Sequence, residues 1–244
     1  MKKFITENLK SLIYALIIAL IIRSLIIQPF YIPSSSMEPS LLFGDRLFVS
    51  KYSYGYSKNS FPFSPPIFKG RIFFNNSPKR GDVIVFKTPE DNRTDYIKRL
   101  IGLPGDKISI ESNEIFINGK KIKRTFKEKE KYKLFNVQKV KETLPNRKSY
   151  DVYEFEKSLA ILNTDNFKEV VVPNESFFVL GDNRDNSQDS RFLGFIPKEN
   201  LVGRAELVFL SFDVEIGSFI KFWTWYSALR KDRFFVSLLP DKDD

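Results

Sequence analysis

The chain has 244 residues, of which 42% are hydrophobic and 15% aromatic, enough apolar material for a sizeable buried core. It contains no cysteine and no histidine, which excludes disulfides, thiolate metal sites, imidazole zinc ligands, cysteine nucleophiles and the Ser-His-Asp arrangement of many hydrolases. The formal net charge of +9 is typical of nucleic-acid binding, of attraction to anionic lipid, or simply of a solubilising surface.

Residues 11–32 are the long apolar stretch of the chain, and residues 1–10 form a short basic head before it. A bilayer is crossed by about 20 apolar residues, so this stretch predicts a transmembrane anchor. Three lysines precede it, and no Lys or Arg occurs between Ser24 and Asp45. The positive-inside rule therefore places the N-terminus in the cytoplasm and the rest of the chain outside.

A cleavable secretory signal is the competing interpretation, because a basic head, an apolar stretch and small residues at 34–36 loosely fit one. However, Arg23, Gln28 and Pro29 separate the apolar run from those small residues. An uncleaved anchor is the favoured prediction.

A Gly-Asp pair recurs along the remaining chain and marks the starts of predicted strands. Glycine supplies the backbone conformation of a tight turn, and aspartate bonds back to the local backbone. The pairs lie at 44–45, 81–82, 105–106 and 181–182, and the first three precede strand-like text at 46–49, 83–86 and 107–110. A hairpin with a type I′ turn at Asn118-Gly119 is predicted between 114–117 and 120–122. Later strands are predicted at 169–172, 177–180 and 202–210.

The expected fold is therefore mainly β: an N-terminal transmembrane helix followed by an antiparallel β-sheet catalytic domain with an inserted, smaller β cap. The β domain is expected to comprise 33–122 and 169–244, and the Lys/Glu-rich cap 123–168. Residues 51–80 are interpreted as a long loop near the membrane. The aromatic tail at 219–226 fits either a membrane interface or ordinary packing.

Three consecutive hydroxyls, Ser34, Ser35 and Ser36, follow the apolar stretch directly. From the residues alone, a serine here could be a nucleophile, a helix cap or linker, and Ser35-x-x-Glu38 matches a capping box. The choice depends on whether the chain supplies a base.

Lys98 is the candidate base. If residues 96–100 form a strand, Lys98 shares a face with the apolar neighbours Tyr96 and Leu100. Desolvation there would lower the lysine pKa from about 10.4 toward the ~7–8 that suits a general base.

The densest polar motif is residues 181–194, GDNRDNSQDSRFLG, directly after an apolar predicted strand. It lacks the glycine and glutamate spacing of an EF-hand, and its two arginines oppose a cation. Alternating Asp and Arg instead predict an internal lattice of ion pairs and hydrogen bonds that stiffens a loop beside a site.

The segments PSSSMEPSL, RGDVIVF, DYIKRLIGLPGD and GDNRDNSQDSRFLG, in this order, resemble the successive sequence boxes of bacterial type I signal peptidases. The resemblance covers the anchor and roughly residues 23–50, 80–110 and 175–210. It implies a Ser/Lys endopeptidase of the plasma membrane, crossing once, with the catalytic domain on the outer face. Its substrates would be preproteins with small residues at −1 and −3 of the cleavage site.

The resemblance also implies a role for particular residues. Ser36 takes the place of the nucleophile that forms an acyl-enzyme, and Lys98 that of the general base. Ser34 matches the hydroxyl that forms the oxyanion hole with the Ser36 N–H. The remaining correspondences are Ser187, which orients the lysine amine; a structural pair, Asp189 and Arg191; and shallow pockets lined by Phe30, Ile32, Met37, Leu41, Tyr96 and Ile97. The family uses neither a metal nor another cofactor, and nucleic acid is not an expected partner.

One position departs from the family pattern, since Ser35 stands where glycine is common between the two serines. Glycine tolerates more backbone conformations than serine, so the loop geometry is the feature in question. Three alternative functions are compatible with parts of the sequence: a related peptidase dedicated to one secretion substrate, a self-cleaving repressor, and a non-enzymatic anchored domain that binds peptides or lipid. The predicted anchor argues against the repressor.

Overall fold

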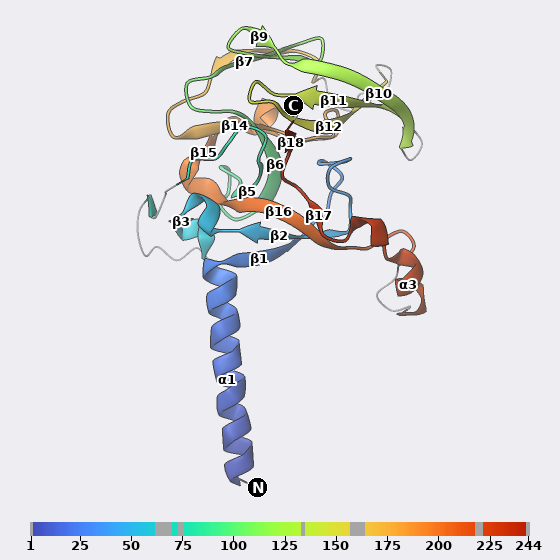
Figure 1. Ribbon diagram of the computed structural model, residues 1–244. Coiled ribbons are helices and arrows are strands. Elements are labelled where there is room, and N and C mark those ends of the chain that lie inside the picture. Colours follow the sequence, from blue (N-terminus) through green and yellow to red (C-terminus); the bar gives the residue numbers. More distant parts are fainter. Residues whose placement is uncertain are drawn as a thin grey trace.

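The structure, a computed structural model, describes residues 2–61, 70–72, 76–132, 135–156, 164–217 and 222–242. Its N-terminal element is a long helix, α1 (Lys2–Leu25), which projects away from a body made of β-sheets (Figure 1). Among the described residues, no helix is both long and apolar enough to cross a membrane. The rest of the protein nevertheless leaves the apolar side chains of α1 exposed. The large ones between Leu12 and Ile22 have exposed fractions of 44–66%.

The predicted apolar segment 11–32 is not helical throughout. Helix α1 ends at Leu25, and the next residues form strand β1 (Ile27–Tyr31), which pairs with β2 (Asp45–Ser50). Pro29 explains the change, because it has no N–H to donate and disfavours a helical conformation at the residue before it. The helical part of the predicted anchor is therefore shorter, and its last residues belong to the sheet.

The body is organised around an eight-stranded antiparallel sheet with the order β1-β2-β16-β5-β6-β14-β15, to which β17 adds alongside β16. The strands after β2 are β5 (Val83–Lys87), β6 (Asp95–Gly102), β14 (Ser176–Leu180), β15 (Ile196–Pro197), β16 (Leu201–Ser211) and β17 (Val236–Ser237). The expected antiparallel architecture and most predicted strands are confirmed.

Both faces of the central strands are buried. On β5, Val83 and Val85 enter one apolar cluster, whereas Ile84 and Phe86 enter another on the opposite face. Neighbouring residues of a strand point to opposite faces, so an unbroken apolar run such as 83–86 is what a strand covered on both sides requires.

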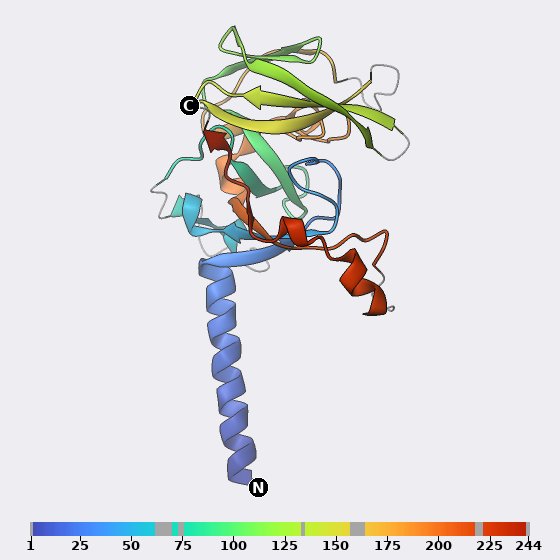
Figure 2. The same ribbon diagram turned by 45° about the vertical axis from the view of Figure 1, so that its right-hand side comes forward.

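Two smaller antiparallel sheets lie at the end of the body away from α1 (Figures 1 and 2). One has the order β13-β7-β8-β9, with bounds Phe167–Val171, Lys107–Glu111, Glu114–Ile117 and Lys120–Lys121. The other has the order β10-β11-β12-β18, with bounds Lys123–Tyr132, Phe135–Thr143, Lys148–Phe155 and Asp241–Lys242. The predicted cap at 123–168 thus contains three long strands, and the C-terminal end of the chain joins their sheet.

The remaining elements are short. They are strands β3 (Tyr56–Ser57) and β4 (Arg71–Ile72), helices α2 (Ser190–Leu193) and α3 (Trp225–Ala228), and the single turns η1 (Tyr52–Tyr54), η2 (Lys58–Ser60), η3 (Lys198–Asn200), η4 (Phe222–Thr224) and η5 (Lys231–Arg233). Parts of the predicted loop 51–80 and of the aromatic tail 219–226 lie outside the described residues.

Three of the four Gly-Asp pairs form the same turn. Gly44, Gly81 and Gly105 have φ of 96°, 94° and 85°, a region that favours glycine. In each turn the aspartate accepts a backbone N–H from three residues earlier, at 2.8, 2.9 and 2.6 Å. Asn118 and Gly119 likewise both have positive φ, as a type I′ hairpin turn needs. Gly181, in the fourth Gly-Asp pair, is not among the glycines with positive φ, and its role is described with the candidate active site.

Candidate active site

Ser36 lies in the turn region that connects β1 to β2. No helix begins here, so the capping-box interpretation is wrong: the Glu38 N–H donates to the Ser35 carbonyl in a turn, at 3.2 Å. The Ser36 carbonyl accepts the Asn183 N–H at 3.1 Å, and the Asn183 side chain donates to the Ser35 carbonyl at 3.2 Å. Asn183 of the polar motif (residues 181–194) therefore holds the backbone of the serine loop (residues 34–36) through two hydrogen bonds.

Lys98 reaches this loop from strand β6. It stands opposite Ile84 on β5, and its Nζ lies 2.8 Å from Ser36 Oγ and 3.0 Å from the Ile97 carbonyl oxygen. The two side chains are 62 residues apart in sequence. The structure thus brings the predicted nucleophile and the predicted base within direct hydrogen-bonding distance.

The surroundings of Lys98 disfavour its charged form. The residue is 4% exposed, and burial lowers its pKa from 10.5 to about 8, despite the nearby negative charges of Asp189 and Asp182. Desolvation acts this way because the ammonium loses its hydration. The predicted lowering of the lysine pKa is confirmed, and a useful fraction of Lys98 is neutral near neutral pH.

Ser34 stands on the solvent side of Ser36. Its Oγ lies 3.4 Å from Ser36 Oγ, and its side chain is exposed. A hydroxyl in this position can turn toward a group that binds over Ser36. Ser35, between them, points instead toward the polar motif and accepts a hydrogen bond from the Asn186 amide at 3.0 Å.

The Ser35 backbone does not require glycine. Among the described residues with positive φ, Ser35 does not appear, so serine occupies the position without strain in the left-handed region. The departure from the family pattern therefore adds a hydrogen bond to Asn186 without a backbone penalty.

Gly181, in the fourth Gly-Asp pair, is needed for its small size. A Cβ built on Gly181 would lie 2.2 Å from Ser187 Oγ and 2.6 Å from the Ser36 carbonyl oxygen. Any side chain would displace Ser187 or the serine loop. Ser187 is buried, and its Oγ has no hydrogen-bond partner among the described residues. The structure therefore places Ser187 at the site without the predicted contact to the Lys98 amine.

Asp189 and Arg191 form the predicted pair. Arg191 donates to both Asp189 oxygens, at 2.9 and 2.8 Å, and Asp189 also accepts the Gly181 N–H at 2.9 Å. Burial opposes the charged carboxylate, but Arg191 and these hydrogen bonds outweigh it, and the pKa of Asp189 is below its ordinary value. This pair holds the backbone at Gly181 beside Ser187.

A second buried pair was not singled out from the sequence. Arg99 binds both oxygens of Asp182 at 2.7 and 2.6 Å, and also donates to the Ser40 hydroxyl at 3.0 Å. It thereby connects β6, the polar motif and the serine loop. The sequence signal was available: Arg99 adjoins Lys98 in the strand and must face the opposite side, where a buried charge needs a partner.

The predicted pocket residues gather unevenly. Four of the six are buried members of one apolar cluster beside the serine loop, a fifth, Phe30, packs at its margin, and Tyr96 packs against the cluster on the other face. The Lys98 amine lies 5.4 Å from the Tyr96 ring centre, so Tyr96 contributes to the apolar surroundings of the amine. The five are Phe30, Ile32, Met37, Leu41 and Ile97. Across the described part of the chain, no three Asp or Glu side chains gather as a metal site would require.

The chain is similar to known proteins both in a family model and in overall sequence. The family model described as "Signal peptidase, peptidase S26" matches residues 5–210. A signal peptidase I of Rickettsia typhi is 41% identical over 97% of this chain and 95% of its own length, and one of Rickettsia bellii is 42% identical over 99% and 88%. A crystal structure of a signal peptidase I from Enterococcus faecalis, 28% identical, matches 53% of this chain and 97% of its own with a TM-score of 0.33.

Proposed function

The chain belongs to the signal peptidase family, peptidase S26, and from this premise we propose that it removes signal peptides through a Ser36/Lys98 dyad. The enzyme is a serine peptidase of the bacterial type I signal peptidase group. The observation that carries the dyad is the 2.8 Å contact between the buried Lys98 amine and Ser36 Oγ. The non-enzymatic alternative is set aside by the family membership.

In this mechanism, neutral Lys98 takes the Ser36 hydroxyl proton while Oγ attacks the carbonyl carbon of the scissile bond. The tetrahedral intermediate then breaks its C–N bond, and the Lys98 ammonium returns the proton to the departing amine. A water molecule, deprotonated by Lys98, hydrolyses the resulting ester and restores Ser36. A lysine with a pKa of about 8 can perform both proton transfers near neutral pH.

The oxyanion of the intermediate would be bound by the Ser36 N–H and the Ser34 hydroxyl. Ser34 Oγ lies 3.4 Å from Ser36 Oγ on the exposed side of the loop, where a substrate carbonyl would sit. Donors that point at a developing oxyanion contribute about 2.7–4 kcal/mol each to transition-state stabilisation. The Ser187 hydroxyl would orient the Lys98 amine, as in the family, by moving closer to it when substrate is bound.

Within the described part of the chain, two strand edges have no partner strand and suit an extended peptide substrate. β1 is the end strand of its sheet, and residues 95–98 of β6 pair with β5 but not with β14. A peptide can add to such edges through backbone hydrogen bonds. Ile32 and Ile97, buried together in one cluster with Phe30 at its margin, would leave room for only small side chains at −1 and −3.

We also propose that α1 holds the enzyme to the plasma membrane, with its N-terminus in the cytoplasm and its sheets outside. The large apolar side chains of α1 are exposed along the helix, and such a surface is stabilised by lipid. The adjacent strand β1 then keeps Ser36 close to the membrane, where an apolar signal peptide would be presented.

The test is cleavage of purified preproteins by the full-length protein in detergent or vesicles. The wild type is expected to release mature protein at the signal cleavage site, and Ser36→Ala to lose at least about 1,000-fold in kcat/KM. Several unrelated preproteins would separate a general enzyme from one dedicated to a single substrate. Wild-type cleavage rates in Ser36→Ala and Lys98→Ala would overturn the dyad.

A further inference from the structure

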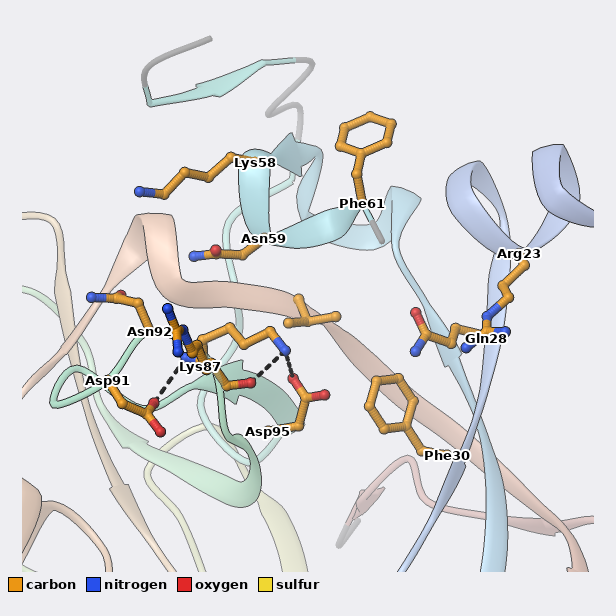
Figure 3. A pocket seen from close by; sticks show the side chains of 12 residues that line it. Arg23, Gln28, Phe30, Lys58, Asn59, Phe61, Lys87, Asp91, Asn92 and Asp95 are labelled. Atoms are coloured by element: carbon orange, nitrogen blue, oxygen red, sulfur yellow. Dashed lines mark hydrogen bonds and ion pairs between the residues drawn. The ribbon is translucent and has the colours of Figure 1, made fainter. Parts of the chain in front are cut away.

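A cavity of about 550 Å³ lies where the end of α1 meets the sheet (Figure 3). Its walls come from Arg23 of α1, Phe30 of β1, Lys58 of η2 and the turn that joins β5 to β6. Phe30 and Phe61 give it an apolar side, and the rest of its lining is polar or charged. Phe30 and Asp95 also border the proposed peptide site, but the catalytic proposal gives the cations of this cavity no role.

The cavity carries more positive than negative charge. Its cations are Arg23, Lys58, Lys87 and Arg93, and its carboxylates are Asp91 and Asp95. Asp95 is already paired with Lys87 at 2.8 Å. Asp91 is already saturated by the Thr88 and Thr94 hydroxyls and by two backbone N–H groups, which lower its pKa.

Asp91 keeps its negative charge, so the lining has four cations against two carboxylates, and three of the cations have no ion-pair partner among the described residues. The side chains of Arg23, Lys58 and Arg93 have no ion pair or side-chain hydrogen bond to any residue that the structure describes. The pKa of Lys51, which is buried nearby, is lowered to about 8 by burial first and by the positive charge of Arg23 second, while Asp95 acts in the opposite direction. A site with an excess of cations that have no ion pair is complementary to an anion.

The position of the cavity identifies the anion. Arg23 lies in the last turn of α1, so with α1 in lipid the cavity lies at the level of the phospholipid headgroups. We propose that it binds the phosphate of an anionic phospholipid through Arg23, Lys58 and Arg93, with the first part of the lipid against Phe30 and Phe61. This inference rests on the proposed attachment of α1 to the membrane.

The experiment uses the full-length protein in neutral detergent, with equimolar phosphatidylglycerol and phosphatidylcholine, and measures retained lipid by native mass spectrometry. The wild type is expected to retain phosphatidylglycerol in excess. Replacing Arg23, Lys58 and Arg93 together by Gln should reduce that excess by about 100-fold, because each basic residue near a lipid surface contributes about a factor of five. The matched control replaces Lys107, Lys120 and Lys123 by Gln; these are exposed lysines far from α1, and the excess should persist.

Several results would overturn the proposal. One is an unchanged phosphatidylglycerol excess in the cavity variant, and another is an equal loss in the control. Displacement of the lipid by inorganic phosphate at equal concentration would point to a soluble anion. A cavity variant that keeps the lipid but changes KM for preproteins with acidic residues upstream of −3 would assign the cavity to the peptide.

Flotation with phosphatidylcholine vesicles tests the underlying attachment separately. The wild type and the cavity variant should float equally, because α1 is intact apart from Arg23. Failure of the wild type to float would overturn the attachment, whereas failure of the lipid preference alone would overturn only the headgroup site.

Discussion

Lys51 and Lys98 are both buried, at 1% and 4% exposure, and burial lowers the pKa of each from 10.5 to about 8. Their contacts differ. The Lys98 amine meets the Ser36 hydroxyl at 2.8 Å, whereas the Lys51 amine donates to the Ser60 carbonyl. A carbonyl has no proton to transfer, so only Lys98 can serve as a base.

The comparison separates two properties that are often treated as one. Burial lowers a lysine pKa wherever it occurs, and it does so twice in this chain. Chemistry requires in addition a proton donor in contact and an opening for substrate. Lys98 has the proton donor, and residues 95–98 have one strand edge that no described residue pairs with, where the proposed substrate would bind.

The largest expected effect is the loss of cleavage when the Lys98 amine is removed, compared with removal of the Lys51 amine. Lys98→Met should lower kcat/KM for preprotein cleavage by about 1,000-fold or more, in the range that general bases contribute. Lys51→Met should stay within about twofold of the wild type per folded molecule, since its amine meets no hydroxyl. Equal losses in both variants, with both folded by circular dichroism, would erase the distinction between the two lysines.

The pH dependence sharpens the same contrast. A base must be neutral to accept a proton, so kcat/KM should rise about tenfold per pH unit below the Lys98 pKa of about 8 and level off above it. Lys51→Met should keep this alkaline rise. Residual activity of Lys98→Arg should lack it, and a wild-type profile flat from mildly acid to alkaline pH would contradict Lys98 as the base.

Stability should not distinguish the two lysines. Each lysine has a pKa of about 8 in the folded chain and an ordinary pKa of 10.5. Between these two pH values, the unfolded chain holds a proton on each lysine that the folded chain has lost. The free energy of unfolding therefore rises with pH in this window, by about 1.4 kcal/mol per pH unit for each lysine. Urea unfolding of the wild type and Lys51→Met at pH 8 and 10 should show a smaller rise in the variant. Parallel curves would mean that Lys51 is not titrating there.

The smallest expected effect concerns the loop that presents Ser36 to Lys98. Lys51 has no such loop with a hydroxyl facing its amine. Ser35→Gly removes the 3.0 Å bond from Asn186 and should cost about 1–2 kcal/mol of stability. Cleavage should stay within about threefold, because the Asn183 bonds to residues 35 and 36 remain. When Ser35→Gly is introduced into Asn186→Ala, it should lower the free energy of unfolding much less than it does in the wild type. An equal decrease in both backgrounds would contradict the hydrogen bond between Asn186 and Ser35.

Local patterns predicted much of the fold and the residues of the site. Gly-Asp turns, apolar runs and the Asn118-Gly119 hairpin located most strands, because turn geometry and burial act on neighbouring residues. Alternation along residues 96–100 predicted that Lys98 would be desolvated. The resemblance to signal peptidases paired it with Ser36, which no local pattern could do across 62 residues.

Other features depend on partners far away in the chain. The end of α1 at Leu25 follows from Pro29 and from the pairing of β1 with β2. Asn183 and Asn186 bind the serine loop only because the sheet brings the two segments together. The burial of Lys51 and the cationic cavity beside α1 likewise arise from packing.

The sequence by itself determined the chemistry that is possible: with neither histidine nor cysteine, an activated serine must use a lysine, a carboxylate or a second hydroxyl, and the ordered motifs contain a lysine. Only the tertiary structure decided which buried lysine meets a hydroxyl and which meets a carbonyl. The physical reason is that the local apolar pattern around Lys98 predicts only the burial of that residue, whereas the burial of Lys51 and the partner of each buried amine are set by how distant strands and loops pack around them.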